Sequence, residues 1–343
     1  MQNSNDEHLR PEHLFAVMDL PLHAIAEHYG LQLTLVERIL SGFLSDNYSL
    51  TDGTQKFFFK KHRHTKRDWV EGASLAEQFF AQGGVPVILP IVDKRGAYFF
   101  EHEGSFYSLY PYVDGRHIER GLLSEQASVS TGEVLGRLHK RGAQSTLPVK
   151  ETFNPWDKEK FLRIEAAVDK ILSEKQELSE FDELTRKSLQ LKKHCVLGGS
   201  PTFEDLGLKN DHLIHGDYFC NNVFFDEGDR VSYVFDFEKA QYAPGPYELF
   251  RGLFVNYFSI PTEENLRLAK VYVDSYLSEY PQPKDVLRSS LTAAYLKQIH
   301  SIWIEEGHYL KGSTRMDPLL SSQHTLNEYY VSNRERIEKY LLA

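Results

Sequence analysis

The sequence is poor in cysteine, with only Cys195 and Cys220 in 343 residues. Two cysteines in a chain of this length form no disulfide framework, and the absence of a CxxC pair or a Cys/His cluster argues against zinc. The N-terminal run MQNSNDEHLRPEH has no apolar core, so we expect no signal peptide. No apolar run is long enough to span a bilayer. We therefore expect a cytoplasmic protein without a membrane partner.

Positive charge is also in short supply, because the formal net charge is −10. This balance argues against a general partner of nucleic acid or anionic membranes. It is compatible with a cationic substrate, although acidity that keeps a protein in solution is the simpler explanation. The apolar fraction of 41% and the charged fraction of 26% are ordinary for a globular enzyme. The sequence does not predict an oligomeric state.

The first third of the chain reads as a short helix followed by a strand-rich lobe. Residues 14–30 have helical spacing that ends at Gly30, and Asp52-Gly53 is typical of a hairpin turn. A helix with an apolar stripe of Trp69, Ala73, Ala76 and Phe80 is expected to stop at the pair Gly83-Gly84. The expected strands lie in residues 31–40, 47–53, 55–64, 85–93, 97–104 and 105–113.

Beyond the turn at residues 114–116 the pattern is mostly helical, interrupted by a β-hairpin. We predict an α+β fold of two lobes: a polar segment and helix (1–30), a small β-rich lobe with one helix (31–113), and a large helical lobe (114–343) that contains the hairpin.

The stretch HGDYFCNN, residues 215–222, places polar side chains where a strand should be packing. DEGDR is a turn between two short strands, and centring it near Gly228 places Asn222 opposite Phe235, beside Asp236. Asp217 lies in the loop just before the first strand. An amide and carboxylates that meet at one end of a hairpin are hard oxygen ligands, which suit Mg²⁺.

This spacing is that of a phosphoryl-transfer site. Asp217 would accept the proton of an attacking hydroxyl, and Asn222 and Asp236 would hold Mg²⁺ against nucleotide phosphates. Each residue alone would fit a structural role, with His215 and Asp217 capping a turn and Asn222 filling a bulge. The joint spacing favours the kinase interpretation.

Two segments, LIHGDYFCNNVFF and VFDFEKAQYAPGPYEL, resemble the aminoglycoside phosphotransferase and choline kinase-like family. The resemblance extends from about Val36 to about Leu310. It implies a protein-kinase-like fold, ATP bound by the small lobe, and a hydroxyl-bearing small-molecule acceptor in the helical lobe.

The same resemblance implies a strand lysine that reaches the phosphates and a helix glutamate that pairs with it. Lys60 and Lys61 lie on opposite faces of the expected strand, and the family pattern favours Lys60. Glu71 and Glu77 are the candidates for the glutamate. Glu71 is favoured because it is expected to face inward, whereas Glu77 lies near the helix C-terminus, where the dipole disfavours an anion.

The remaining nucleotide contacts are assigned by the same comparison. Ser41 and Gly42 would form a reduced phosphate loop, which lacks the glycines of protein kinases. If Leu109 lies behind the adenine, the carbonyl of Tyr110 and the N–H of Tyr112 would bond its edge.

Some residues depart from the family pattern or have an open role. Glu248 stands where an aspartate is usual and is expected to support the catalytic loop. Cys220 is expected to fill space. Trp303, His300 and Tyr309 are candidates for the acceptor pocket, although a core Trp and a surface His are the simpler expectation.

The sequence thus predicts an ATP- and Mg²⁺-dependent O-phosphotransferase acting on an amino alcohol, amino acid, sugar or aminoglycoside. Two alternatives stay open: a Ser/Thr protein kinase of the bacterial stress-response type, and a catalytically silent protein on a kinase-like scaffold.

Overall fold

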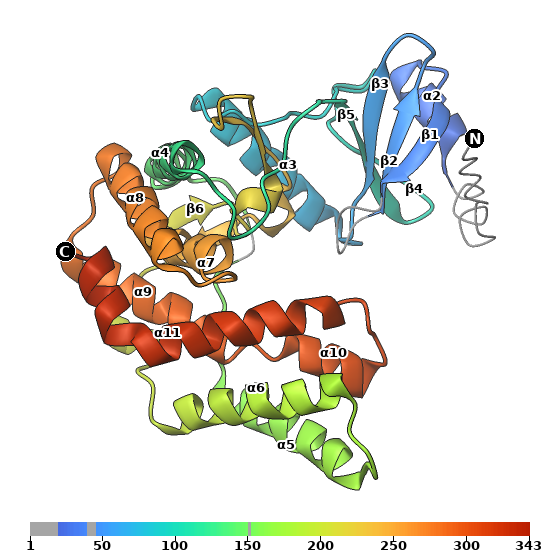
Figure 1. Cartoon of the computed structure of the whole chain (residues 1–343). Coiled ribbons are helices and arrows are strands. Elements are labelled where there is room, and N and C mark those ends of the chain that lie inside the picture. Colours follow the sequence, from blue (N-terminus) through green and yellow to red (C-terminus); the bar gives the residue numbers. More distant parts are fainter. Residues whose placement is uncertain (1–19, 40–45, 150–151) are drawn as a thin grey trace, which may run out of the picture. The chain divides into compact units, whose positions relative to one another are not determined.

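The computed structural model describes residues 20–39, 46–149 and 152–343, and the chain divides into two compact units. The first unit takes in the chain up to Val70 together with Leu89–Asp114, and the second takes in Glu71–Ile88 together with Gly115–Ala343. Strands dominate the first unit and helices the second, which confirms the predicted α+β class (Figure 1). Within the described ranges, no helix has both the length and the apolar character that a membrane crossing requires.

The first unit is built on one antiparallel sheet with strand order β1-β2-β3-β5-β4. The hairpin between the second and third strands turns at Asp52-Gly53, as predicted. There Oδ1 of Asp52 accepts the N–H groups of Thr54 and Gln55, and Gly53 has a φ of 91°. The strands are β1 (Thr34–Ile39), β2 (Asp46–Thr51), β3 (Lys56–Lys61), β4 (Phe100–His102) and β5 (Ser105–Pro111).

An apolar core lies on one face of this sheet. Helix α2 (Leu22–Tyr29) contributes the fully buried Ile25, which belongs to the same core as Phe59 and Leu109. The helix ends at Gly30, as predicted, and the φ of 73° at this position is one that glycine adopts without strain. The residues of β3 and β5 that point into this core therefore fix which residues point to the other face.

The segment 85–93 was predicted to be a strand, and this prediction is wrong. It forms a single bridge between Val87 and Val234 and the hydrogen bonds from Ile88 N–H to Val234 O and from Ile91 N–H to Leu109 O. Pro86 and Pro90 supply no N–H, so a continuous ladder cannot form along this segment.

Helix α3 (Arg67–Gln82) confirms the predicted helix and its stop signals. The N–H of Gly84 bonds to the carbonyl of Ala81, and the φ of Gly84 is 80°. Ala73, Ala76 and Phe80 are buried as expected, but Trp69 is 38% exposed and lies off the buried stripe.

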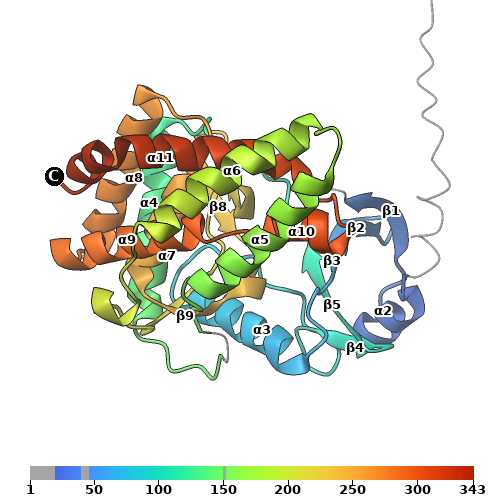
Figure 2. The same cartoon turned by 90° about the horizontal axis from the view of Figure 1, so that it is seen from below.

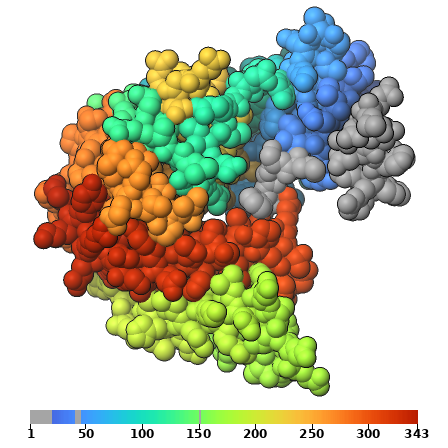
Figure 3. All heavy atoms as spheres, in the orientation of Figure 1, coloured from blue at the N-terminus to red at the C-terminus, as the bar shows by residue number. Residues whose placement is uncertain are grey.

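The second unit is a helical assembly that carries four short strands. Helix α4 packs closely on α8, because a Cβ at Gly132 would lie 2.4 Å from the carbonyl oxygen of Tyr272. Helix α11 runs between α8 and the α6 helix (Figures 1 and 3), and α5 and α6 lie side by side (Figure 2). The helices are α4 (Glu125–Gly142), α5 (Lys158–Glu174), α6 (Glu180–Leu197), α7 (Gly245–Tyr257), α8 (Glu263–Glu279), α9 (Lys284–Ile299), α10 (Trp303–Lys311) and α11 (Leu320–Leu341).

The four strands of this unit form two separate antiparallel pairs. β6 (His212–Ile214) pairs with β9 (Gln241–Ala243), and β7 (Val223–Phe225) pairs with β8 (Val231–Val234). The second pair is the predicted hairpin. In the first pair, β6 precedes this hairpin in the chain and β9 follows it. Their pairing brings the loop after β6 next to the segment before β9.

Candidate active site

The loop that carries Asp217 leaves β6 through Gly216. Gly216 has a φ of 83°, and a Cβ there would lie 1.9 Å from the carbonyl oxygen of Lys239. Only glycine permits both the left-handed backbone and this close approach. The HGD sequence therefore presses the Asp217 loop against the segment that follows the hairpin.

The hairpin register places Asn222 where the sequence predicted it. Val223 pairs with Val234, and the N–H of Phe235 donates to the carbonyl of Asn222 at 3.1 Å. The Nδ2 of Asn222 donates to the backbone carbonyl of Asp217 at 2.8 Å, which leaves its Oδ1 as the atom able to bind a metal. The neighbouring Asp236 has φ 67° and ψ 60°, a left-handed conformation that aspartate tolerates better than most residues.

Two cations hold the carboxylate of Asp217. The Nζ of Lys239 lies 2.7 Å from Oδ2, and Nη2 of Arg251 lies 2.5 Å from Oδ1. Burial by itself would raise the pKa of Asp217, but the charges of Arg251 and Lys239 hold it well below its usual range. The carboxylate is therefore ionised and fixed in orientation at neutral pH.

Glu248 anchors the other side of the loop, as expected. It is fully buried at the start of α7 and accepts the N–H groups of His215 at 3.1 Å and Tyr218 at 3.2 Å. The Nε2 of His139 lies 3.0 Å from the same carboxylate, and Nδ1 of His139 bonds to the hydroxyl of Tyr276. Burial opposes ionisation of Glu248, yet these donors lower its pKa.

His215 positions the loop from within. Its Nε2 lies 2.9 Å from the carbonyl oxygen of Phe235, and its Nδ1 lies 3.2 Å from the backbone nitrogen of Asp217. The first contact requires Nε2–H to donate and the second requires Nδ1 to accept, which together assign the neutral Nε2–H tautomer. His215 thus ties the Asp217 loop to the end of the hairpin.

Cys220 has a structural environment. It is fully buried, its N–H donates to Oδ1 of Asn256 at 3.0 Å, and burial raises the pKa of its thiol to about 12. A thiol with so high a pKa is not a nucleophile at neutral pH. The expectation that this residue fills space is consistent with its surroundings.

Lys60 and Lys61 lie on opposite faces of β3, as predicted. Lys61 shares the face of Phe59, and its Nζ lies 6.0 Å from the ring centroid of Tyr107 in the apolar core. Lys60 lies on the other face with Phe58 and is only 6% exposed. Among these two, Lys60 is therefore the lysine outside the core face.

The expected orientation of the two helix glutamates is wrong. Glu71 is exposed, whereas Glu77 is only 5% exposed. The reason is the helical period: Glu77 falls four residues after Ala73 and three before Phe80, on the buried stripe, and Glu71 does not. Helix position relative to the dipole did not decide which carboxylate turns inward.

The strand register also changes the expected adenine contacts. Leu109 pairs with Phe59 and lies in the core of the first unit, so it cannot lie on the face of Lys60. Its carbonyl points away from β3, because it accepts the N–H of Ile91 at 2.6 Å. Bonding alternates along an antiparallel strand, so the carbonyl of Tyr110 points toward Phe58 and that of Pro111 points away from β3.

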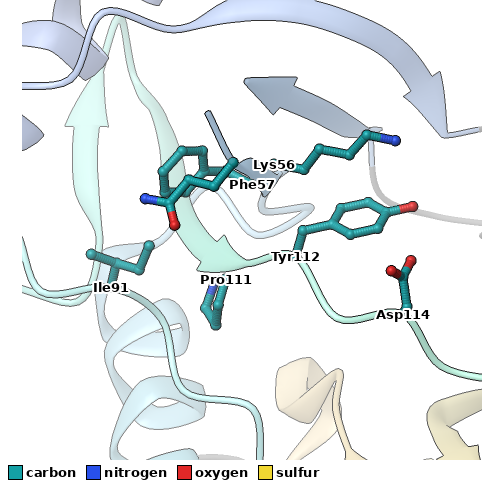
Figure 4. A pocket seen from close by; sticks show the side chains of 7 residues that line it. Lys56, Phe57, Ile91, Pro111, Tyr112 and Asp114 are labelled. Carbon is teal, nitrogen blue, oxygen red and sulfur yellow. The ribbon is translucent and has the colours of Figure 1, made fainter. Parts of the chain in front are cut away.

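A pocket of about 380 Å³ lies at this end of the first unit (Figure 4). Lys56 and Tyr112 extend side by side there, with Nζ 5.3 Å from the ring centroid. Its lining residues are Gln55, Lys56, Phe57, Ile91, Pro111, Tyr112 and Asp114. It contains Tyr112 of the predicted lobe connection but none of the predicted catalytic or metal-binding residues. Ser41 and Gly42 fall in residues 40–45, outside the described ranges.

The late aromatic residues differ from their simplest expectation. Trp303 is 43% exposed and His300 is buried, the reverse of a core Trp and a surface His. The hydroxyl of Tyr309 donates to Asp182 at 2.6 Å.

Sequence reasoning missed Lys239 and Arg251. Lys239 follows Asp236 by three residues in the segment DFEK, so its position near the site could have been predicted from the sequence. Arg251 follows Glu248 by one helical turn, and only the placement of α7 brings it to Asp217.

Comparison with known proteins agrees with this geometry. A family model described as the phosphotransferase enzyme family matches residues 35–286, most of the chain. A search of curated proteins gave no match.

Several solved structures share the fold. An amicoumacin kinase in complex with AMP-PNP, Ca²⁺ and Ami is 16% identical, with 96% of each chain covered and a TM-score of 0.61. A spectinomycin phosphotransferase in complex with ADP and spectinomycin is 14% identical, covers 93% of this chain and 92% of its own, and has a TM-score of 0.60. Choline kinase from Cryptosporidium parvum Iowa II is 13% identical, with 94% and 96% covered and a TM-score of 0.57. At these low sequence identities, the similarity shows a shared kinase-like fold alone.

Proposed function

Because the chain belongs to the phosphotransferase enzyme family, we propose that it is an ATP- and Mg²⁺-dependent O-phosphotransferase that phosphorylates a hydroxyl of a small molecule. One observation carries the proposal: an ionised Asp217 is fixed at the end of a hairpin whose base presents Asn222 and Asp236. This is the set of residues that phosphoryl transfer requires, at the required spacing.

In the proposed reaction the acceptor oxygen forms a bond to the γ-phosphorus of ATP while the bond from that phosphorus to the β–γ bridging oxygen breaks. The products are the phosphate ester, ADP and a proton. Asp217 orients the hydroxyl and receives its proton. A low pKa suits this role in a loose transition state, because the proton leaves late and positioning matters more than base strength.

Asn222 and Asp236 fit a hard divalent cation. They offer one amide oxygen and one carboxylate, which matches the habit of Mg²⁺ to take few protein ligands and to complete its shell with water and phosphate. Within the described ranges, no group of three or more His, Cys, Asp or Glu forms an alternative metal site. When bound, the metal would neutralise charge on the β- and γ-phosphates.

On the nucleotide side we propose Lys60 for the phosphates and Glu77, in place of Glu71, for the helix carboxylate. Burial supports both choices. We propose the outward carbonyl of Pro111, in place of that of Tyr110, as the acceptor for the adenine edge, with Tyr112 beside it. The assignment of Ser41 and Gly42 to the phosphate loop stays a prediction.

A small-molecule acceptor is favoured over a protein substrate by the segment after Asp236. Only the short strand β9 stands between the helical turn at Phe237–Lys239 and α7, which begins at Gly245. A protein kinase requires a longer activation segment there to receive its peptide. A catalytically silent role is disfavoured because Lys60, Asp217, Asn222 and Asp236 are all present.

The proposal is tested by ATP consumption with Mg²⁺ against panels of amino alcohols, amino acids, sugars, hydroxy acids and aminoglycosides, with a protein extract as a parallel acceptor. Asp217→Asn serves as the inactive reference. Phosphate transfer to protein alone would favour the stress-response kinase alternative, and no transfer together with no nucleotide binding would contradict the proposal.

A further inference from the structure

Cations gather around the catalytic carboxylate of the second unit. Besides Lys239 and Arg251, which contact Asp217, Arg120 lies on the same side of the loop. The guanidinium carbon of Arg120 is 4.9 Å from the ring centroid of Phe219, and that of Arg251 is 5.9 Å from the same ring. Two guanidinium groups therefore lie against the ring of Phe219, and Nε of Arg120 donates to Oδ1 of Asn221 at 3.4 Å.

Lys297 extends this positive region from another helix. It lies near the end of α9, donates to the backbone carbonyls of Asn154 and Pro155, and lies near the charges of Lys160 and Arg251. Lys297 thus contacts neutral oxygens, like charges and the ring of Phe153, whose centroid lies 5.5 Å from Nζ. Within the described residues, no carboxylate forms an ion pair with Lys297.

The acidic groups near Asp217 already have other partners or another proposed role. Glu248 is fully buried and is bonded to His139 and to two backbone N–H groups. Asp157 caps α5 by accepting the N–H of Lys160 at 2.8 Å. Asp236 belongs to the proposed metal site. None of these three described carboxylates is left to bind a cationic acceptor beside Asp217.

One donor in the region lacks an acceptor. Nη1 of Arg251 is buried and makes no hydrogen bond with any described residue. A charged donor left without a partner is costly, and a guanidinium matches the two oxygens of a carboxylate or phosphate better than any other side chain does. An oxyanion placed here would satisfy it.

We propose that the acceptor is an anionic alcohol, carrying a carboxylate or phosphate group that Arg251, Lys297 and Arg120 recognise while its hydroxyl faces Asp217. This proposal rests on the proposed phosphotransferase function and names the substrate class of that site. The transfer is the one written above: the hydroxyl oxygen of the acceptor gains the γ-phosphoryl group, and its existing acidic group is unchanged. The global charge of −10 does not report this local excess of positive charge.

The physical reason is Coulomb repulsion. A cationic acceptor would add a like charge beside Arg251 and Lys297, whereas an oxyanion would offset charges that now face one another. The cluster therefore selects against amino alcohols and aminoglycosides, which are otherwise plausible acceptors for this fold.

The test uses four probes with one three-carbon alcohol skeleton: 3-amino-1,2-propanediol, glycerol, glycerate and glycerol 3-phosphate. Each is titrated calorimetrically into the full-length protein, with and without AMP-PNP and Mg²⁺. We expect the two anions to bind at least tenfold more tightly than the amine, and their order distinguishes a carboxylate from a phosphate site. Equal binding of all four, no binding of any, or preference for the amine would overturn the proposal.

Matched variants test which side chains cause the preference for the anionic probes. Lys297→Gln should lower the affinity for the anions by about tenfold and leave glycerol binding unchanged, while Lys284→Gln, an exposed lysine on the same helix, should change neither. Arg120→Gln tests the affinity for the anions at a residue outside α9. Thermal melting confirms that each variant folds. Equal behaviour of the Lys297 and Lys284 variants would overturn the assignment.

The design separates this inference from the proposed function. AMP-PNP binding and slow ATP hydrolysis without acceptor report on phosphoryl transfer alone. If both fail while the charge preference persists, the phosphotransferase proposal falls and the oxyanion site stands. If both succeed while the amine binds best, only the oxyanion inference falls.

Discussion

Arg251 holds Asp217 by its Oδ1, with Nη2 at 2.5 Å, while Lys239 holds the other carboxylate oxygen at 2.7 Å. The base proposed for the reaction is thus flanked by a cation on each oxygen. Two consequences follow from this arrangement: Asp217 stays ionised over the working pH range, and its orientation is fixed before any substrate arrives.

Replacing Arg251 by Gln should therefore change the pH dependence of the reaction. Arg251 lowers the pKa of Asp217, so its removal raises that pKa, and the carboxylate becomes protonated at a higher pH. We expect the acid limb of the kcat profile to move to higher pH and kcat to fall. Arg267→Gln, which alters an exposed arginine paired with Glu264, is the control. An acid limb that does not move would mean that Asp217 is not the titrating group.

Asp217→Asn should lower the rate by about 10²–10⁴-fold, the usual contribution of a positioned general base. Affinity for Mg·ATP should persist, since the proposed metal ligands are Asn222 and Asp236. Turnover assays and calorimetric titration of AMP-PNP measure the two effects. Asp226→Asn, in the hairpin turn, is the matched control, and wild-type turnover by the Asp217 variant would remove it from the mechanism.

The hairpin could be predicted from sequence because its turn is local. Centring the turn near Gly228 placed Asn222 opposite Phe235, to which it is hydrogen-bonded, but the register shift between Phe224 and Phe225 was not predicted. The support from Glu248 was also expected, because it stands at a position where the family carries a carboxylate. The hairpin pairing is local in the sequence and the position of Glu248 belongs to a family motif, so both could be predicted.

What could not be predicted depends on packing between distant elements. Arg251 reaches Asp217 only because α7 lies beside the loop, and Lys297 of α9 comes near Arg251 through the packing of α9 on α7. The expected inward orientation of Glu71 was wrong because a dipole effect worth about 0.3–1 kcal/mol was weighed above the buried stripe through Ala73 and Phe80. Residues 85–93 have a strand-like composition, but their prolines lack the N–H groups that a continuous ladder of hydrogen bonds requires.

The loop anchor can be tested through stability. Glu248→Ala removes a fully buried carboxylate and leaves His139 and two backbone N–H groups without their acceptor. A buried donor left without an acceptor typically costs about 1–3 kcal/mol, so the loss of this acceptor should lower the free energy of unfolding by about 3 kcal/mol or more, measurable by urea denaturation. Glu263→Ala, at the exposed start of α8, should change it by less than about 0.5 kcal/mol. A small effect at Glu248 would mean that the loop is held by other contacts.

The two lysines of β3 give a paired prediction. Lys60→Met should raise the KM for ATP or lower kcat, because it removes the charge proposed for the phosphates. Lys61→Met, on the opposite face, should leave the KM for ATP and kcat nearly unchanged. A double-mutant cycle of Lys60→Met with Glu77→Gln should show coupling, and a cycle with Glu71→Gln should show none. Coupling to Glu71 instead would restore the original helix assignment.

The last prediction concerns the charge state of Lys297. Burial and the charges of Lys160 on α5 and Arg251 on α7 lower the pKa of its ammonium to about 8, and no carboxylate among the described residues pairs with it. On the same turn, burial lowers the pKa of His300 and raises that of Tyr295, so both side chains are neutral near pH 8. Lys297 is thus a cation below about pH 8 and neutral above it. The folded chain then binds fewer protons than the unfolded chain between about pH 8 and 10.5, so this group should make the free energy of unfolding rise with pH in that window.

Acceptor binding should follow the same titration with the opposite sign. Glycerate is a suitable probe, because its carboxylate stays ionised throughout, as carboxyl groups titrate near pH 4. We expect its dissociation constant to be constant up to about pH 7 and to rise as pH passes through about 8. Lys297→Arg keeps a positive charge above pH 12 and should abolish that rise, whereas Lys297→Met should bind glycerate weakly at every pH. If the wild type and the Arg variant weaken in parallel, another group titrates, and Lys297 does not hold the anion.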